Sequence, residues 1–407
     1  MRIESVALDN ADPLATYREA FDLPQGLIYL DGNSLGALPR AVRDTLSKTV
    51  EVEWGQDLIK SWNTHDWINL PESVGEKIAP LLGAESGQVI CTDSTSINLF
   101  KLIVAALQLR PGRRKILSQV DNFPTDLYMA QGIEALLGAD RAQLVTVSAE
   151  EITASIDAET ALVMLTHVNF RDGQIHDMAG VTRAAHEHGA LVLWDLSHST
   201  GAMPLALDAL EVDFATGCGY KYLNGGPGAP AYIYVNRGHQ DEAVQPLFGW
   251  MGHADAFSFS PDYQPAEGVW RFVTGTPSVI AMQALSAALD LFAGIDLEQV
   301  RQKSEVLTTR FIDSLVDCPE LELISPAAAA ARGSQVSFRH PQGYAIVQAL
   351  AAAGVIGDYR DPGILRFGFS PLYTSFTEAE EAARLLRDIL TSQSYLEPAF
   401  QVRQTVT

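Results

Sequence analysis

The feature that most constrains the fold is an alternation of short apolar runs with amphipathic segments through the middle of the chain. The runs are nearly continuous in Val, Ile and Leu, which is typical of strands covered on both faces. The segments between them, such as 97–109 and 179–189, have helical spacing. We therefore expect a parallel or mixed sheet wrapped by helices. The expected strands are 88–92, 113–120, 143–148, 161–168, 190–197, 213–219 and 231–235.

From about residue 278 the pattern changes to longer helical segments with isolated strands between them. This change predicts a smaller α+β unit beside the large one. The Ala run at 327–331 is the only compositionally biased stretch, and it indicates a loop or the start of a helix. The expected helices are 279–295, 296–316, 344–355 and 376–390, and the expected strands are 334–340 and 364–369.

The net charge of the chain argues against two classes of binding partner, nucleic acids and membranes. Lys and Arg total 28 against 50 Asp and Glu, a formal net charge of −22, while 47% of the residues are hydrophobic. The apolar content supports a large core. An acidic surface repels phosphate backbones and anionic lipids, so we expect no nucleic-acid or membrane partner.

The cysteines and the N-terminus indicate a cytoplasmic protein. Cys91, Cys218 and Cys318 lie far apart, an odd number without a CxxC pair. That pattern fits a reducing compartment and argues against a disulfide framework or a Cys-rich zinc site. The first residues carry acidic groups where a secretory signal needs apolar ones, and no apolar run approaches the roughly 18 residues of a membrane span. His186 and His188 are two residues apart on an expected helix, so they do not share a face, and we expect no metal site.

An acid and a lysine follow neighbouring expected strands. Asp195 ends the run ALVLWD, and Lys221 lies in the glycine-rich segment GCGYKYLNGGPGAP after the next strand. Ligands of open α/β sheets bind at the carboxyl ends of strands, so both side chains are expected to face one crevice. Pyridoxal phosphate needs a lysine amine for a Schiff base and a carboxylate for its pyridine nitrogen. The ordinary alternative is a turn aspartate and a solvated lysine, and the strand-end context favours the cofactor site.

Two further segments offer groups that suit the phosphate and the aromatic ring of such a cofactor. Thr95 and Ser96 lie where a strand gives way to a helix, so their hydroxyls and free backbone N–H groups suit a phosphate. The alternative is a plain N-cap by Ser94 or Thr95. In DNFPTD, Phe123 can lie against an aromatic ring and Asp126 beside it, or the segment is simply a turn.

Taken together, these segments resemble the kynureninase family, pyridoxal-phosphate enzymes of the type I aminotransferase fold that are related to class V aminotransferases. The resemblance covers most of the chain. It rests on IYLDGNSLGALP at 28–39, then STSINLFKL, DNFPTD, WDLSHSTGA, GCGYKYLNGGPGAP, FGWMGH, FVTGTP and LRFGFSPLY. The separation of Asp195 and Lys221, 26 residues, also fits that family. The family carries a serine in many members where this chain has GCG before Tyr220.

The resemblance implies a fold and a division of the chain. It implies a large domain with a mostly parallel seven-stranded sheet wrapped by helices, and a smaller α+β C-terminal domain. We expect an N-terminal segment at 1–50 that packs on the small domain, a large cofactor-binding domain at 51–280 and the small domain at 281–407.

The resemblance also implies a role for individual residues. Lys221 would form the Schiff base, Asp195 would pair with the pyridine nitrogen, and Tyr220 would share in catalysis. Arg366 would clamp the α-carboxylate of the substrate, for which a planar guanidinium is suited. The full implied cofactor set is Thr95, Ser96, Phe123, Asp126, Thr166, Asp195, His198, Tyr220, Lys221, Trp250 and Thr276, and the implied substrate set is Arg366, Trp62, His65 and Asn33. Trp62 and His65, with Trp67, could equally be packing a loop.

The family reaction is the hydrolysis of the Cβ–Cγ bond of L-kynurenine to anthranilate and L-alanine. It belongs to tryptophan catabolism and feeds NAD biosynthesis, and family members are homodimers with the active site at the subunit interface. Whether 3-hydroxykynurenine is also a substrate stays open, as does the group that activates water. The alternatives are a class V aminotransferase, a cysteine desulfurase, or a non-catalytic binding protein on the same fold.

Overall fold

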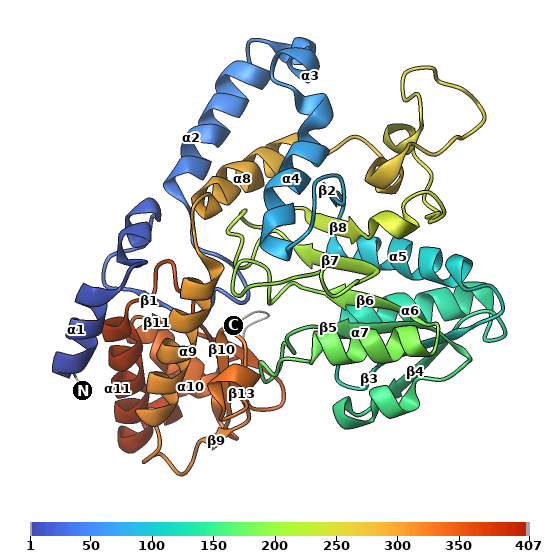
Figure 1. Ribbon diagram of the computed structural model, residues 1–407. Helices are drawn as coiled ribbons and strands as arrows, with labels where there is room; N and C mark the ends of the chain where they lie inside the picture. Colours follow the sequence, from blue (N-terminus) through green and yellow to red (C-terminus); the bar gives the residue numbers. More distant parts are fainter. Residues whose placement is uncertain (1, 404–407) are drawn as a thin grey trace.

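The computed structural model describes residues 2–403, and its centre is a seven-stranded sheet in the order β2-β8-β7-β6-β5-β3-β4 (Figure 1). β8 runs antiparallel to both of its neighbours, while the other pairings are parallel. The parallel or mixed sheet predicted from the apolar runs is therefore confirmed, as is the mostly parallel seven-stranded sheet that the family resemblance implies. The strands are β2 (Val89–Cys91), β3 (Lys115–Gln119), β4 (Gln143–Val147), β5 (Thr160–Thr166), β6 (Leu191–Asp195), β7 (Phe214–Cys218) and β8 (Ala231–Val235).

Helices cover both faces of this sheet, which explains why its strands are apolar at nearly every position. Alternate residues of β6 serve different cores. Leu191 and Leu193 pack with side chains of α5 (Thr95–Leu109) and α6 (Pro124–Leu137). Val192 and Trp194 pack with side chains of α4 (Leu70–Leu82), α7 (Met178–Glu187) and α8 (Val279–Leu289) on the other face.

The C-terminal part forms a second layer beside the large sheet (Figure 1). It has a four-stranded antiparallel sheet in the order β12-β13-β10-β9, with a separate apolar core around Phe311 and Phe367. Strands 334–340 and 364–369 and the long helices were predicted, whereas β9 and β12 were not. The elements are α9 (Leu297–Asp313), β9 (Glu322–Leu323), β10 (Gln335–Arg339), α10 (Gly343–Ala352), β12 (Asp358–Arg360), β13 (Ile364–Gly368), α11 (Phe376–Ser392) and α12 (Pro398–Gln401).

The N-terminal segment contacts both parts of the molecule. α1 (Arg2–Ala11) lies against α11, and β1 (Ile28–Tyr29) pairs with β11 (Val355–Ile356). α2 (Arg40–Lys48) packs against α8. α8 begins at the predicted 280/281 boundary, yet it buries Met282 and Leu285 in the core of the large sheet. The division at residues 50 and 280 stays a prediction.

The remaining helical elements are short. Beyond α2 the chain continues through a π-helical segment to α3 (Ser61–Thr64) and α4. The turns are η1 (Ala15–Ala20), η2 (Thr49–Trp54), η3 (Leu58–Lys60), η4 (Trp67–Asn69), η5 (Ala149–Glu151), η6 (Thr153–Ser155), η7 (Arg237–His239), η8 (Trp250–Gly252), η9 (Gly268–Phe272), η10 (Asp290–Phe292), η11 (Ala329–Ala331) and η12 (Ser394–Leu396).

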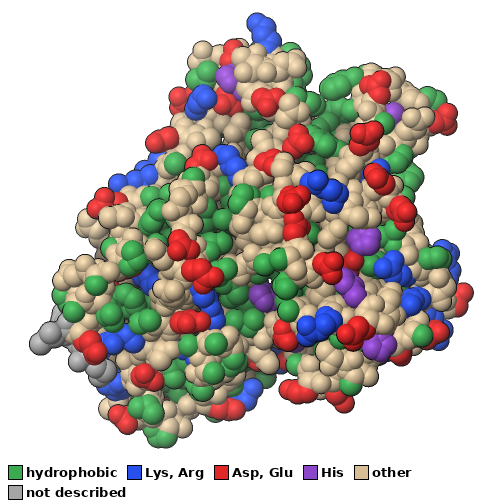
Figure 2. All heavy atoms as spheres, in the orientation of Figure 1, with side chains coloured by type: hydrophobic (Ala, Val, Ile, Leu, Met, Phe, Trp, Pro, Cys, Tyr) green, Lys and Arg blue, Asp and Glu red, His purple; other side chains and the backbone are tan. Residues whose placement is uncertain are grey.

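Within residues 2–403, no single helix has the length and apolar character needed to cross a membrane. Only the pair Val279–Phe292 and Leu297–Asp313 meets the criteria of length and composition together, and these two segments are bent by 87°. On the face shown in Figure 2, Lys and Arg side chains are interspersed with Asp and Glu.

Candidate active site

The topology brings the predicted residues to one edge of the large sheet. Thr166 ends β5 and Asp195 ends β6, and the two stand opposite each other in the parallel pairing. Both share the strand face of Leu193, the face covered by α5 and α6, because side chains on one face recur every second residue. α5 and α6 begin just after the carboxyl ends of β2 and β3, at this same edge. The strand ends and the two helix starts therefore surround one space.

That space is a cavity of about 510 Å³. The residues predicted for the cofactor and for catalysis line it together, with Trp250 as the exception. The predicted residues in its wall are Thr95, Ser96, Phe123, Asp126, Thr166, Asp195, His198, Tyr220, Lys221 and Thr276.

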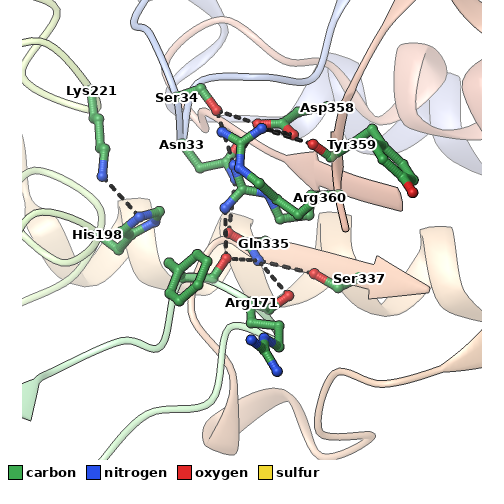
Figure 3. A network of polar contacts seen from close by, with 12 residues as sticks. Asn33, Ser34, Arg171, His198, Lys221, Gln335, Ser337, Asp358, Tyr359 and Arg360 are labelled. Atoms are coloured by element: carbon green, nitrogen blue, oxygen red, sulfur yellow. Dashed lines mark hydrogen bonds and ion pairs between the residues drawn. The ribbon is translucent and has the colours of Figure 1, made fainter. Parts of the chain in front are cut away.

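Lys221 lies at the end of β7 with its amine inside the cavity. Its Nζ is 2.9 Å from Nε2 of His198 (Figure 3). The rings of Phe123 and Tyr220 lie 5.9 and 6.0 Å from Nζ. Burial lowers the pKa of His198 well below its usual value, and Lys221 lowers it further. The neutral imidazole therefore accepts a hydrogen bond from the lysine ammonium.

Several buried polar atoms of the cavity wall have no hydrogen-bond partner among residues 2–403. They are both carboxyl oxygens of Asp126, Oγ1 of Thr166 and Nδ1 of His198. Burial raises the pKa of Asp126 well above its usual value, and the neighbouring Asp195 raises it further. Buried polar atoms are normally hydrogen-bonded, so such a group indicates a polar ligand.

Asp195 is held in place at the floor of the cavity. Its Oδ1 accepts a hydrogen bond of 2.8 Å from the backbone N–H of Ser197. Burial raises the pKa of the Asp195 carboxyl, while the Ser197 hydrogen bond and Lys221 oppose that rise. A cation bound against this carboxylate would favour its ionised form.

The start of α5 forms another wall of the cavity. Ser94 is the N-cap, and its side chain accepts from the N–H of Ile97, so the cap predicted as an alternative is present. Thr95 and Ser96 follow it in the first turn and line the cavity. Helix N-termini offer free N–H groups and a positive dipole end, which together suit a phosphate.

Sequence reasoning missed a buried ion pair under this turn. Lys101 of α5 is fully buried, and its Nζ contacts both Asp93 Oδ2 and the backbone oxygen of Phe272, each at 2.5 Å. Asp93 lines the cavity and has a positive φ of 49°. The pair therefore ties the turn before α5 to the 272–276 segment. A lysine within the apolar run LFKLIV was the available signal.

Five predicted residues lie outside the cavity wall, namely Trp250, Trp62, His65, Asn33 and Arg366. Trp250 is 36% exposed and contacts the ring of Phe257. The ring of Trp62 packs edge-on to Trp67, with centroids 6.1 Å apart, and His65 Nε2 lies 2.7 Å from Asp57 Oδ2, near α3. Figure 1 places α3 at the tip of the molecule beyond α4.

The fourth is Asn33, which is fully buried. It donates a hydrogen bond of 2.8 Å to Gln335 Oε1, and its own Oδ1 has no partner (Figure 3).

Arg366 lies one layer behind the cavity. Its Nη1 donates a hydrogen bond of 2.6 Å to the backbone oxygen of Phe170, a residue of the cavity wall. Its Nη2 contacts Asp358 and Ser34. Phe170, Ser34 and Asp358 were not predicted. The contacts of Phe170 and Ser34 with Arg366 span 196 and 332 residues, and Asp358 meets Arg366 through the register of β12 and β13.

The cavity fits pyridoxal phosphate by the chemistry of its walls. It offers an amine on Lys221, a buried carboxylate on Asp195, an aromatic ring on Phe123 and a helix start at Thr95. The unpartnered atoms described above match the polar substituents of such a ring. Among residues 2–403, no group of three or more His, Cys, Asp and Glu side chains is arranged to hold a metal ion.

Comparisons with known proteins agree on a family. A model described as the kynureninase C-terminal domain matches residues 300–386, and one of the DegT/DnrJ/EryC1/StrS aminotransferase family matches 72–204. The kynureninase of Burkholderia pseudomallei (strain 1106a) is 48% identical over 413 residues, covering 100% of this chain and 99% of the relative. The kynureninase of Pseudomonas fluorescens is 47% identical with the same coverage.

Solved structures agree on the fold. The Escherichia coli cysteine desulfurase CsdA superposes with a TM-score of 0.78 at 21% identity, over 93% of this chain and 98% of that one. A C-DES mutant with glycine covalently linked to its pyridoxal-phosphate cofactor has a TM-score of 0.79 at 20% identity, over 91% and 98%. At this identity the likeness shows the fold alone, and it confirms the predicted type I architecture.

Proposed function

Because the chain belongs to the kynureninase family, we propose that the cavity at the strand ends is where it hydrolyses kynurenine. The enzyme uses pyridoxal phosphate to break the Cβ–Cγ bond of L-kynurenine, giving anthranilate and L-alanine. The observation that carries the site assignment is the meeting of Lys221, Asp195 and the start of α5 around one cavity.

We assign the residues of the wall to parts of the cofactor. Lys221 bonds the aldehyde carbon, and Asp195 pairs with the pyridine nitrogen and keeps it protonated. Phe123 lies against the ring. The phosphate is held by Thr95 and Ser96 in the first turn of α5, with Tyr220 and Thr276 beside it. The unpartnered atoms of Asp126, Thr166 and His198 bind the polar groups of the ring.

When bound, the cofactor supplies an electron-withdrawing ring that stabilises negative charge on the substrate carbons next to its amine. Arg366 binds the α-carboxylate of the substrate. The amine of Lys221, oriented by neutral His198, takes and returns the proton at the α-carbon. Water adds its oxygen to the γ-carbon, the Cβ–Cγ bond breaks, and the β-carbon receives a proton from Tyr220 or Lys221. The net reaction adds one water across the Cβ–Cγ bond to give anthranilate and L-alanine, so it needs no oxidant or reductant.

We also propose that the enzyme is a homodimer with its site at the interface. An apolar groove of about 660 Å³ runs between α2 and α8, and Pro277 and Ser278 belong to both the groove and the cavity. Next to it, Trp54, Leu58 and Ile59 are 56%, 59% and 77% exposed. Apolar surface of this kind favours a partner, and its continuity with the cavity favours a second copy of the chain. Trp62, His65 and Trp250 would then act at the partner's cavity.

The dimer is tested by light scattering on Ile59→Asp, with the exposed Val316→Asp, far along the chain on the small domain, as the matched control. We expect the native protein and the control to have the mass of a dimer and to be active. Ile59→Asp is expected to shift toward the mass of a monomer and to lose activity. A native monomer with full turnover contradicts the proposal.

A cytoplasmic location is proposed on the cysteines. Cys91, Cys218 and Cys318 are all buried and unpaired. This arrangement suits a reducing compartment. Cys318 is also unsuited to sulfur chemistry, because burial raises the pKa of its thiol and a reactive thiolate needs the opposite.

The reaction is tested by steady-state turnover of three substrates on the cofactor-loaded enzyme, namely L-kynurenine, 3-hydroxykynurenine and L-cysteine. We expect anthranilate and L-alanine from kynurenine, and no sulfide from cysteine. The ratio of the first two rates sets the ring preference. Sulfide release without anthranilate would establish a desulfurase instead.

A further inference from the structure

A charged cluster behind the cavity is built from three separate segments. Asp358 of β12 stands opposite Arg366 of β13 in the antiparallel pairing, and their side chains, 2% and 3% exposed, form an ion pair. Asp358 has two further partners: Oδ2 accepts from Ser34 Oγ at 2.7 Å and Oδ1 accepts from Arg360 Nη1 at 2.7 Å (Figure 3). One buried carboxylate thus holds two guanidinium groups and a hydroxyl.

The cluster reaches the cavity through Phe170. The backbone oxygen of Phe170 accepts from Arg366 Nη1 at 2.6 Å and from Gln335 Nε2 at 3.0 Å. The ring of Phe170 lines the cavity and packs edge-on to Phe123, with centroids 5.2 Å apart. Arg366 is therefore fixed to the wall against which a substrate would lie.

The hydrogen bonds of Arg366 leave a donor free. A guanidinium has five N–H donors, and here Asp358, Ser34 and Phe170 engage Nη1 and Nη2. The Nε of Arg366 is buried and has no partner. When the neighbouring carboxyl of Asp31 is protonated, Asp358, Arg360 and Arg366 together carry one net positive charge, which matches the single charge of one carboxylate.

We propose that Asp358 is a positioning residue for the substrate: its buried carboxylate holds in place the guanidinium of Arg366, the group proposed to bind the α-carboxylate of kynurenine. This inference rests on the proposed role of Arg366. Asp358 touches neither substrate nor cofactor, and it acts through the arginine. Ser34, which bonds both Asp358 and Arg366, belongs to the same device.

A purely electrostatic role and a positioning role of Asp358 predict opposite effects of Asp358→Asn on the binding of an anion. The variant keeps the size of the side chain but removes its negative charge, so the cluster becomes more positive by one unit. If Asp358 only neutralised the cluster, the variant would bind an anion more tightly. If Asp358 positions Arg366, the variant binds the α-carboxylate more weakly despite the added positive charge.

The test measures two ligands on the cofactor-loaded Asp358→Asn enzyme. L-Alanine carries the α-amino acid half of the substrate, and its dissociation constant is read from the visible absorbance of the cofactor. Anthranilate carries the ring half, and its inhibition constant is read from turnover. We expect the alanine dissociation constant and the KM for kynurenine to rise about tenfold, with the anthranilate constant changed by less than about twofold.

Glu322→Gln is the matched control, since it removes the same charge from an exposed side chain of the same small sheet, where Glu322 pairs only with exposed Arg339. We expect it to change neither constant. If Asp358→Asn fails to fold, Ser34→Ala removes a neutral partner of the same device and is expected to weaken alanine binding alone.

Three outcomes overturn the proposal. One is unchanged or tighter alanine binding in Asp358→Asn, and another is an equal loss for alanine and anthranilate, which indicates general damage. Arg366→Gln tests the proposed role of Arg366 separately from the positioning role of Asp358. If it leaves alanine binding intact, the proposed role of Arg366 fails as well, whereas weak binding in Arg366→Gln with normal binding in Asp358→Asn refutes only the positioning role.

Discussion

The two ends of the site are built in different ways. The lysine end, around Lys221 and Asp195, comes from neighbouring strand ends of one sheet, and its wall holds buried polar atoms without partners. The arginine end, around Arg366 and Asp358, comes from segments more than 300 residues apart along the chain, as the 332-residue separation of Ser34 and Arg366 shows. There, carboxylate and guanidinium groups already satisfy one another.

Both ends hold buried polar atoms without partners, but the charged groups are paired within the protein only at the arginine end. At the lysine end, the unpartnered groups of Asp126 and Thr166 gain hydrogen bonds only when a polar molecule enters. At the arginine end, the ion pair fixes the guanidinium of Arg366 within the protein, and the hydrogen bond of Ser34 to Asp358 joins the N-terminal segment to the small sheet. Variants at the two ends should therefore differ in whether they change function, stability or both.

The largest effect is expected for Lys221→Ala. We expect turnover of kynurenine to fall by more than about a thousandfold, because the amine that binds the cofactor and moves the α-proton is lost. The free energy of unfolding of the cofactor-free protein should change less than in Arg366→Gln, since Nζ of Lys221 contacts His198 and acts on buried Asp195 only through its charge. Anthranilate production and chemical denaturation measure the two quantities. Substantial turnover by this variant would refute the assignment.

Arg366→Gln should affect both function and stability. We expect the KM for kynurenine to rise by about a hundredfold, because the α-carboxylate of the substrate loses its proposed guanidinium partner. We also expect the free energy of unfolding to fall by about 3–5 kcal/mol, because Asp358 is left as a buried carboxylate without its main partner. Denaturation of the cofactor-free variant beside Lys221→Ala gives the comparison. Equal stability of the two variants would show that the ends are not built differently.

Removing a single hydroxyl should raise the free energy of unfolding of the cofactor-free protein at the lysine end and lower it at the arginine end. Thr166→Val deletes a buried Oγ1 that has no partner, so the cofactor-free protein should gain up to about 1 kcal/mol while cofactor affinity falls. Ser34→Ala deletes a hydroxyl that bonds Asp358 and Arg366, so the same protein should lose about 1 kcal/mol. Urea denaturation without cofactor measures both. Destabilisation of similar size in both variants would contradict the distinction.

The smallest effect concerns pH and the carboxyl of Asp31, which neighbours the arginine end. Burial, and then Asp358, raises the pKa of Asp31 from 3.8 to about 7. The folded protein therefore holds this proton more tightly than the unfolded chain. Its contribution to stability is full below pH 3.8 and is lost as the pH rises through about 7. Asp31→Asn should flatten the pH dependence of the free energy of unfolding in this window, as measured by denaturation across the range. An unchanged slope would show that a group other than Asp31 titrates in this pH window.

The same contrast explains what the sequence could predict. Part of the lysine end follows from strand ends: the run ending at Asp195 and the glycine-rich segment of Lys221 after the next strand predict that both side chains lie at one edge, without any long-range information. The large sheet was predictable for the same reason, because each apolar run is continuous. Family resemblance added Thr166, Arg366 and Thr276, which strand periodicity alone does not mark.

The arginine end could not be predicted from local pattern. β12 has three residues, and Asp358 meets Arg366 only through the antiparallel register of two strands. Asn33 was predicted to bind substrate, and the structure places it on Gln335, a contact across 302 residues. Contacts of this length depend on how the N-terminal segment and the small sheet pack, which neither spacing nor composition records.

The central claim is that Lys221 is the residue that bonds the cofactor, opposite Asp195. The most direct measurement is reduction of the cofactor-loaded enzyme with borohydride, followed by peptide mapping by mass spectrometry. The account predicts one modified peptide, with the reduced cofactor on Lys221 and none in Lys221→Ala. A cofactor attached to another lysine, or a protein that takes up none, would contradict it.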